Sequence, residues 1–127
     1  MSPLTLAFLG DAVYEVLVRE HIVSSGSAPI NTLHKMSVDK VCAKAQSKAA
    51  DSLLYILTEE EAEILKRGRN ANSAKVPKSS TANDYRKATG LESLFGYLYL
   101  NGEIKRINEI FSYIYQINEN DILKDDK

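Results

Sequence analysis

The sequence has few of the residues that mark a secreted or membrane-spanning protein. Its 127 residues include one cysteine, Cys42, which excludes a disulfide framework and fits a reducing compartment. The start of the chain, Met1 to Pro3, lacks the basic region of a signal peptide. No apolar run reaches the roughly 18 residues that a membrane-spanning helix needs. We therefore expect a cytoplasmic protein that does not enter a membrane.

Prolines and strand-forming patterns are also scarce, whereas helical patterns are frequent. The chain has three prolines, and 44% of its residues are hydrophobic, which is a globular composition. Its length suits one domain with a core. We expect an all-α fold with a single domain over residues 1–117 and a charged tail over 118–127 that frays.

Start and stop signals divide the chain into six expected helices. Ser2 and Pro3 suit a helix start, Thr58 and Glu61 form a capping box, and Gly68 is expected to end a helix in the left-handed conformation. Asn83 or Asp84 is the expected cap of the fifth helix. The expected helices cover residues 3–23, 32–36, 38–57, 59–67, 84–100 and 103–117.

The predicted helix over 38–57 begins after Ser37, its expected N-cap, and has an apolar face. Its opposite face is expected to be basic and polar, with Lys40, Lys44, Gln46, Ser47 and Lys48.

Two apolar helices carry embedded carboxylates beside glycines. Residues 6–18 contain Gly10, Asp11 and Glu15, and residues 88–100 contain Glu92 and Gly96. Glycine inside a helix costs roughly 1 kcal/mol relative to alanine, so it usually serves a close backbone approach. If the two helices cross at their glycines, Asp11 and Glu92 are brought together.

Two carboxylates in one apolar site repel each other and raise each other's pKa. A hard divalent cation resolves this conflict, and Mg²⁺ typically takes one or two carboxylates and keeps several waters. Such an ion activates water and stabilises charge on a phosphodiester. The other interpretation is that both carboxylates lie at the wet edges of their helices.

The net charge of −1 hides a basic segment. Residues 66–87 hold seven basic side chains and one acid, for a net of +6, so the remainder of the chain carries −7. A basic segment inside an acidic protein indicates a polyanion site. Carboxylates for Mg²⁺ and basic residues for phosphates are the minimum for a nuclease. The other interpretation of residues 66–87 is a solvated loop with no binding role.

The two carboxylate helices together resemble a known family. Residues 8–15, Phe-Leu-Gly-Asp-Ala-Val-Tyr-Glu, resemble the signature of the ribonuclease III family, and residues 91–100 resemble its second acidic helix. Three further motifs, at 31–35, 66–71 and 85–86, resemble the Mini-ribonuclease III branch, a catalytic domain without the appended double-stranded-RNA-binding domain. The resemblance covers roughly residues 6–100.

The resemblance implies an all-helical homodimer that cuts double-stranded RNA with Mg²⁺ and leaves 5′-phosphate and 3′-hydroxyl ends. It implies a role in maturing the ends of large-subunit (23S) ribosomal RNA precursors. Whether ribosomal proteins or the pre-ribosome are partners stays an open question. The sequence departs from full-length family members at two positions, where it has Ala7 and Thr89 in place of acidic residues.

The expected site residues follow from these patterns and the resemblance. Asp11 and Glu92 are the catalytic residues and metal ligands. Glu15, His34, Lys35 and Thr89 are candidates for supporting roles. The expected RNA-binding residues are Lys66, Arg67, Arg69, Asn70, Lys75, Lys78, Tyr85 and Arg86.

Two rival functions remain open. One is a non-catalytic RNA-binding relative of the same fold, and the other is a helical protein whose apolar helices serve only dimerisation. The row of Lys40, Lys44 and Lys48 is a second candidate for phosphate contact.

Overall fold

A computed structural model describes residues 1–71 and 81–125, and these residues form helices and turns without a strand. The all-α prediction is therefore confirmed. The 3₁₀ turn η1 separates the third and fourth helices. The elements in chain order are α1 (Pro3–Val23), α2 (Ile30–Val41), α3 (Ala43–Ser52), η1 (Leu53–Tyr55), α4 (Glu59–Asn70), α5 (Ala82–Leu100) and α6 (Ile104–Asp125).

Local capping explains where the helices that carry the site begin. The Ser2 hydroxyl accepts from the Thr5 amide, and Pro3 occupies the first helical position of α1. The predicted capping box of α4 is present, with Thr58 and Glu61 each accepting from the other's backbone amide. The cap of α5 is Thr81, not Asn83 or Asp84, because the Thr81 hydroxyl accepts from the Asp84 amide.

The predicted break between the second and third helices was in the wrong place. Ser37 does not cap a helix; it lies buried inside α2, which continues to Val41. The break comes at Cys42, whose backbone is extended. After it, α3 ends at Ser52 and a 3₁₀ turn follows, so the predicted helix over 38–57 is two helices and a turn.

The predicted end of α4 was also wrong. Gly68 is not left-handed, since among the described residues only Gly26 and Gly102 have positive φ. The helix continues through Gly68 to Asn70, where it packs against α5. The predicted turn at Gly102 is confirmed, and α6 extends beyond residue 117 to Asp125.

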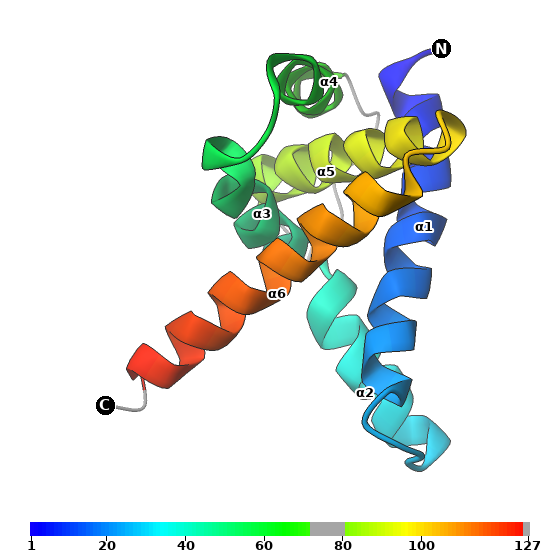
Figure 1. Cartoon of the computed structure of the whole chain (residues 1–127), viewed down its shortest axis with the longest axis vertical. Coiled ribbons are helices and arrows are strands. Elements are labelled where there is room, and N and C mark those ends of the chain that lie inside the picture. The colour runs from blue at the N-terminus through cyan, green and yellow to red at the C-terminus, as the bar shows by residue number, and fades with distance from the viewer. Residues whose placement is uncertain (72–80, 126–127) are drawn as a thin grey trace.

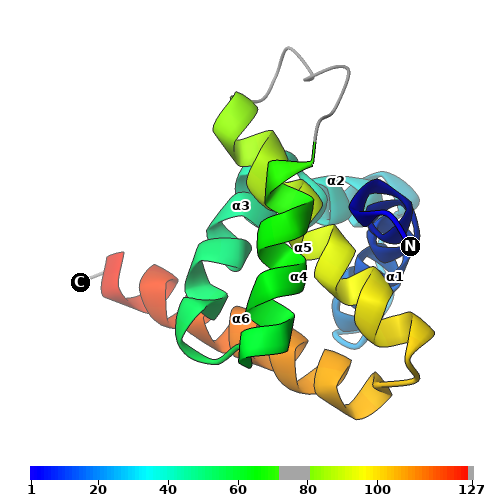
Figure 2. The ribbon, with the colours of Figure 1, turned by 90° about the horizontal axis from the view of Figure 1, so that it is seen from above.

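Helix α5 occupies the centre of the molecule. It packs against α1, α3, α4 and α6 (Figure 1). Viewed from above, α4 lies across α5, and α6 passes underneath (Figure 2). The centre of the core contains Val18, Leu53, Leu91, Leu94, Phe95 and Ile110, which are almost fully buried. A helix enclosed on several sides can hold a carboxylate in a fixed place, and α5 carries Glu92.

Candidate active site

The two carboxylate helices cross with their backbones in contact. A Cβ atom added at Gly10 would overlap the carbonyl oxygen of Glu92, and one added at Gly96 would overlap the carbonyl oxygen of Leu6. Only glycine permits this approach at both positions. The crossing predicted from the two glycines is therefore present, and it sets the residue after Gly10 beside Glu92.

That residue is Asp11, and its side chain meets the Glu92 carboxyl group. The two side chains share a hydrogen bond. Burial, followed by the hydrogen bond and the charge of Asp11, raises the pKa of Glu92 to about 8. Asp11 is exposed, whereas Glu92 is half-buried. The pair therefore opens to solvent on the Asp11 side and is enclosed by protein on the Glu92 side.

A third side chain, which we did not predict, contacts this pair. Gln46 of α3 is 2% exposed and hydrogen-bonds to Glu92, which lowers the pKa of that carboxyl group against the larger effects that raise it. The prediction that Gln46 and Ser47 lie on a polar face is wrong, because both side chains are buried. The spacing of Gln46, Ala49, Ala50 and Leu53 is the signal of an inward face that could have identified it.

Ser93 fixes the position of Glu92 from the next residue along α5. It is fully buried, and its hydroxyl lies 2.8 Å from the Pro3 carbonyl oxygen and 2.9 Å from that of Thr89. Because the Ser93 hydroxyl is shared between these two carbonyl oxygens, it connects the start of α1 to α5. The glycine crossing and this hydroxyl together hold the part of α1 that leads into Asp11.

A second glycine crossing brings α4 to the same helix. A Cβ atom at Gly90 would lie 2.6 Å from the Leu65 carbonyl oxygen and 3.2 Å from the Arg69 amide nitrogen. At Gly68, a Cβ atom would overlap the Ser93 hydroxyl. The basic C-terminal end of α4 is thereby held two residues from Glu92 along α5.

Several of the expected RNA-binding residues lie at this end. Lys66, Arg67 and Asn70 are exposed on α4, and Arg69 is half-buried against α5. At the start of α5, Tyr85 is half-buried and Arg86 is exposed. Lys75 and Lys78 lie outside the described residues.

The expected supporting residues divide into those near the pair and those with other contacts. Thr89 is buried on α5, one turn before Glu92, and its hydroxyl donates to the Tyr85 carbonyl at 3.0 Å. Glu15 forms an ion pair with Arg19 on its own helix at 2.8 Å. His34 and Lys35 are exposed on α2, and no described contact connects them to the carboxylates.

The donor set suits a hard divalent cation that keeps much of its water. The described residues contain no group of three or more metal-binding side chains of His, Cys, Asp or Glu. Two carboxylates are nevertheless a usual protein contribution to Mg²⁺. The pKa of Glu92 is raised because burial and the neighbouring Asp11 disfavour its ionised form. A bound cation would favour that ionised form. Asp11 and Glu92 therefore fit such an ion.

Comparisons with known proteins agree with this arrangement. Residues 4–103 match the model of the ribonuclease III domain. The chain belongs to the ribonuclease III family. A Mini-ribonuclease 3 from Thermoanaerobacter sp. is 46% identical over 119 residues, which cover 94% of this chain and 84% of that protein. A Mini-ribonuclease 3 from Brevibacillus brevis is 47% identical over 118 residues, covering 93% and 88% of the two chains.

A solved structure has the same fold as this chain. The crystal structure of protein FN1578 from Fusobacterium nucleatum aligns with a TM-score of 0.83 and 37% identity, covering 91% of this chain and 93% of that one. The predicted resemblance to Mini-ribonuclease III is thus confirmed. Membership of this family supports an endoribonuclease activity, and its enzymes generally use a divalent metal.

No described helix is both long and apolar enough to cross a membrane.

Proposed function

We propose that this protein is a Mg²⁺-dependent endoribonuclease that cleaves double-stranded RNA. The observation that carries the proposal is the carboxylate pair of Asp11 and Glu92, held by two glycines at a helix crossing. The retained pair argues against a non-catalytic relative, which would have no need of it. The basic end of α4, which packs on the helix that carries Glu92, argues against a protein that only dimerises.

Asp11 and Glu92 are the residues that would bind the cation. When bound, Mg²⁺ supplies an activated water and stabilises charge on the phosphodiester. Asp11, on the exposed side, faces the approaching RNA, while Glu92 is fixed by the surrounding helices. Waters, RNA oxygens or Thr89 would fill the ligand positions where acidic residues are absent. The expected products carry 5′-phosphate and 3′-hydroxyl ends.

The RNA is proposed to lie over the basic end of α4 and the start of α5. Lys66 and Arg67 are exposed there, and Arg86 is exposed on α5. Contacts to phosphates carry no sequence information. The accessible minor groove of A-form RNA offers shape and 2′-hydroxyl groups. We therefore expect the protein to select duplexes more than sequences. Lys75 and Lys78 are proposed to bind the RNA as well.

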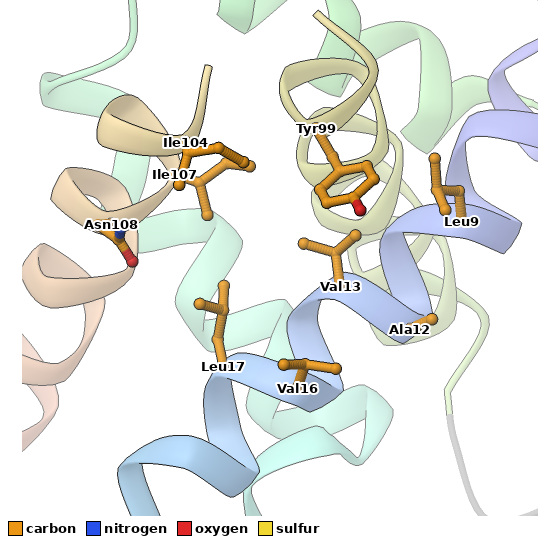
Figure 3. Close-up of a pocket in the computed structure, with 9 residues that line it drawn as sticks. All are labelled: Leu9, Ala12, Val13, Val16, Leu17, Tyr99, Ile104, Ile107 and Asn108. Carbon is orange, nitrogen blue, oxygen red and sulfur yellow. The ribbon is translucent and has the colours of Figure 1, made fainter. Parts of the chain in front are cut away.

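The protein is proposed to act as a homodimer. Phe8 is 85% exposed and Val16 is 61% exposed on α1, which is unusual for such large apolar side chains. An apolar groove of about 310 Å³ that includes Val16 lies between α1, α5 and α6 (Figure 3). Its lining is Leu9, Ala12, Val13, Val16, Leu17, Tyr99, Ile104, Ile107 and Asn108.

A symmetric contact through this surface would cover the apolar side chains of both copies. It would also extend the track for a duplex, which is short on a chain of 127 residues.

For the natural substrate, we propose the precursor of large-subunit (23S) ribosomal RNA, as the resemblance implies. The single cysteine fits a cytoplasmic enzyme. Ribosomal proteins or the pre-ribosome are the partners to test after the duplex itself.

The deciding experiment is cleavage of a long RNA duplex with and without Mg²⁺. We expect cutting with Mg²⁺ and none with EDTA, and a single strand of the same sequence should remain intact. Binding of the duplex without cutting at any Mg²⁺ concentration would favour the non-catalytic relative. A gel shift across salt concentrations that shows no binding at all would favour the dimerisation protein.

A further inference from the structure

The Gln46 side chain is a buried polar group beside the carboxylate pair. It is 2% exposed and lies on α3, which packs against α5 (Figure 1). Its neighbours along the helix, Lys44 and Lys48, are exposed. Burying an amide costs free energy unless its hydrogen bonds are replaced. The hydrogen bonds that Gln46 makes inside the protein therefore indicate the role of this side chain.

The Gln46 side chain has two hydrogen-bond partners. Nε2 donates to the Val41 carbonyl oxygen at 2.9 Å, and the side chain also hydrogen-bonds to the Glu92 carboxylate. The first acceptor is at the end of α2, immediately before the break at Cys42. One amide group thus connects the α2–α3 corner to Glu92.

The oxygen of the same amide is still available. Oε1 of Gln46 is buried and accepts no hydrogen bond from any described residue. A group that served only to satisfy the end of α2 would not need to contact Glu92. The arrangement instead resembles the outer-shell hydrogen bonds that orient carboxylate ligands in metal sites.

We propose that Gln46 is a positioning residue that holds the Glu92 carboxylate toward Asp11 in the orientation needed to bind the cation. This inference rests on the proposed function, because it concerns the same cation site. Gln46 touches neither the RNA nor the cation; it acts through Glu92. The rival role is purely structural, in which the amide only closes the α2–α3 corner at Val41.

The first test uses the unaltered protein, because the chain contains only two glutamines, Gln46 and Gln116. Gln116 is exposed on α6 and serves as an internal reference. In a Mg²⁺ titration followed by NMR, the side-chain amide signals of Gln46 should shift with the same midpoint as the backbone amides of Asp11 and Glu92. Those of Gln116 should stay unchanged.

The three possible results are distinguishable. Shifts at Asp11, Glu92 and Gln46 together support the inference. Shifts at Asp11 and Glu92 without a response of the Gln46 side chain overturn it and leave the proposed cation site intact. The absence of any shift removes the cation site of the proposed function and the role of Gln46 with it.

The second test measures metal affinity directly. Gln46→Met keeps the length and apolar packing of the side chain but removes the amide. Loss of an outer-shell partner typically weakens metal binding by about 10- to 100-fold, and we expect that range for Mn²⁺ measured by calorimetry. Ser47→Ala alters the adjacent buried side chain of the same helix and should leave the affinity unchanged.

A folded Gln46→Met protein with unchanged Mn²⁺ affinity would assign the amide to the structural role alone. If this variant does not fold, the titration of the unaltered protein still decides.

Discussion

Gly10 of α1 and Gly96 of α5 face each other across the helix crossing. A Cβ atom at Gly10 would lie 2.8 Å from the backbone nitrogen of Gly96, and one at Gly96 would lie 3.1 Å from that of Gly10. The first distance is shorter than a real Cβ contact, and the second is tighter than most Cβ contacts in proteins. The position of Asp11 relative to Glu92 therefore depends on two residues that have no side chain.

The first prediction concerns this crossing. Gly10→Ala should force α1 away from α5, because the new methyl group would meet backbone atoms that cannot rotate aside. Overpacking a core usually costs about 1–3 kcal/mol, and we expect a loss of unfolding free energy at or above the upper end of that range. Urea denaturation gives the value, and duplex cleavage by the remaining folded protein should fall as well.

Ala62→Ser is the control for this change, since it also adds one heavy atom to a helix, but at an exposed position of α4. Equal stability of Gly10→Ala and the unaltered protein would show that the two helices can separate without cost.

The second prediction concerns the carboxylates. Asp11→Asn and Glu92→Gln should each reduce cleavage of duplex RNA to the level seen without metal, because each removes one of two charged ligands. The helical circular dichroism spectrum and the affinity for RNA should change little. Glu20→Gln, at an exposed position on α1, removes the same charge outside the site and should cleave normally. Near-normal turnover by either purified site variant would reject the assignment.

The third prediction concerns pH and the metal-free protein. The pKa of Glu92 is about 8 in the folded state, against 4.5 as its ordinary value. Between these values the folded state holds a proton that the unfolded chain has released. The stability associated with this proton is complete below pH 4.5 and is lost as the pH rises through 8.

Thermal unfolding in EDTA at several pH values tests this expectation. The melting temperature should fall from pH 5 to pH 8, and Glu92→Gln should show a shallower decline. Added Mg²⁺ should stabilise the protein more at high pH, because the ligand must lose its proton to bind. Identical pH profiles for the two proteins would contradict the prediction.

The glycines and carboxylates could be predicted because they are local signals. A Gly–Asp pair inside an apolar helix costs free energy in that helix alone, so its presence indicates a tertiary purpose. The capping box at Thr58 was equally local and is present as predicted. These signals lead to Asp11 and Glu92 without knowledge of the rest of the fold.

Gln46 and Gly68 could not be assigned in the same way, because their environments depend on distant residues. The burial of Gln46 follows from the break at Cys42, which sets the rotation of α3 against α5. A glycine near a basic helix end usually marks the end of the helix. Here Gly68 serves the contact with Gly90 and Ser93, which lie more than twenty residues further along the chain.

The fourth prediction concerns the dimer. Val16→Asp places a charge on the exposed apolar surface of α1, in the lining of the groove shown in Figure 3. Burying that charge against a second copy is costly, so the variant should sediment near the monomer mass of 14.1 kDa. The unaltered protein should sediment at twice that mass, and Val23→Asp, at another exposed apolar position of α1, is the control. A monomeric, fully active unaltered protein would exclude the proposed dimer.

The fifth prediction concerns RNA binding by the basic segment. Replacing Lys66, Arg67, Arg69, Lys75 and Lys78 with Gln should weaken binding to all duplexes alike. Each lost phosphate contact should lower the slope of log affinity against log salt by roughly 0.7 to 0.9. Single-turnover cleavage at saturating RNA should fall much less than in Asp11→Asn, because the carboxylate pair is intact. The comparison variant replaces Lys40, Lys44 and Lys48 of α2 and α3 and should keep most of the salt dependence. If the slope changes only in this second variant, the RNA lies along the row of Lys40, Lys44 and Lys48. The basic segment over residues 66–87 is then not part of the RNA-binding surface.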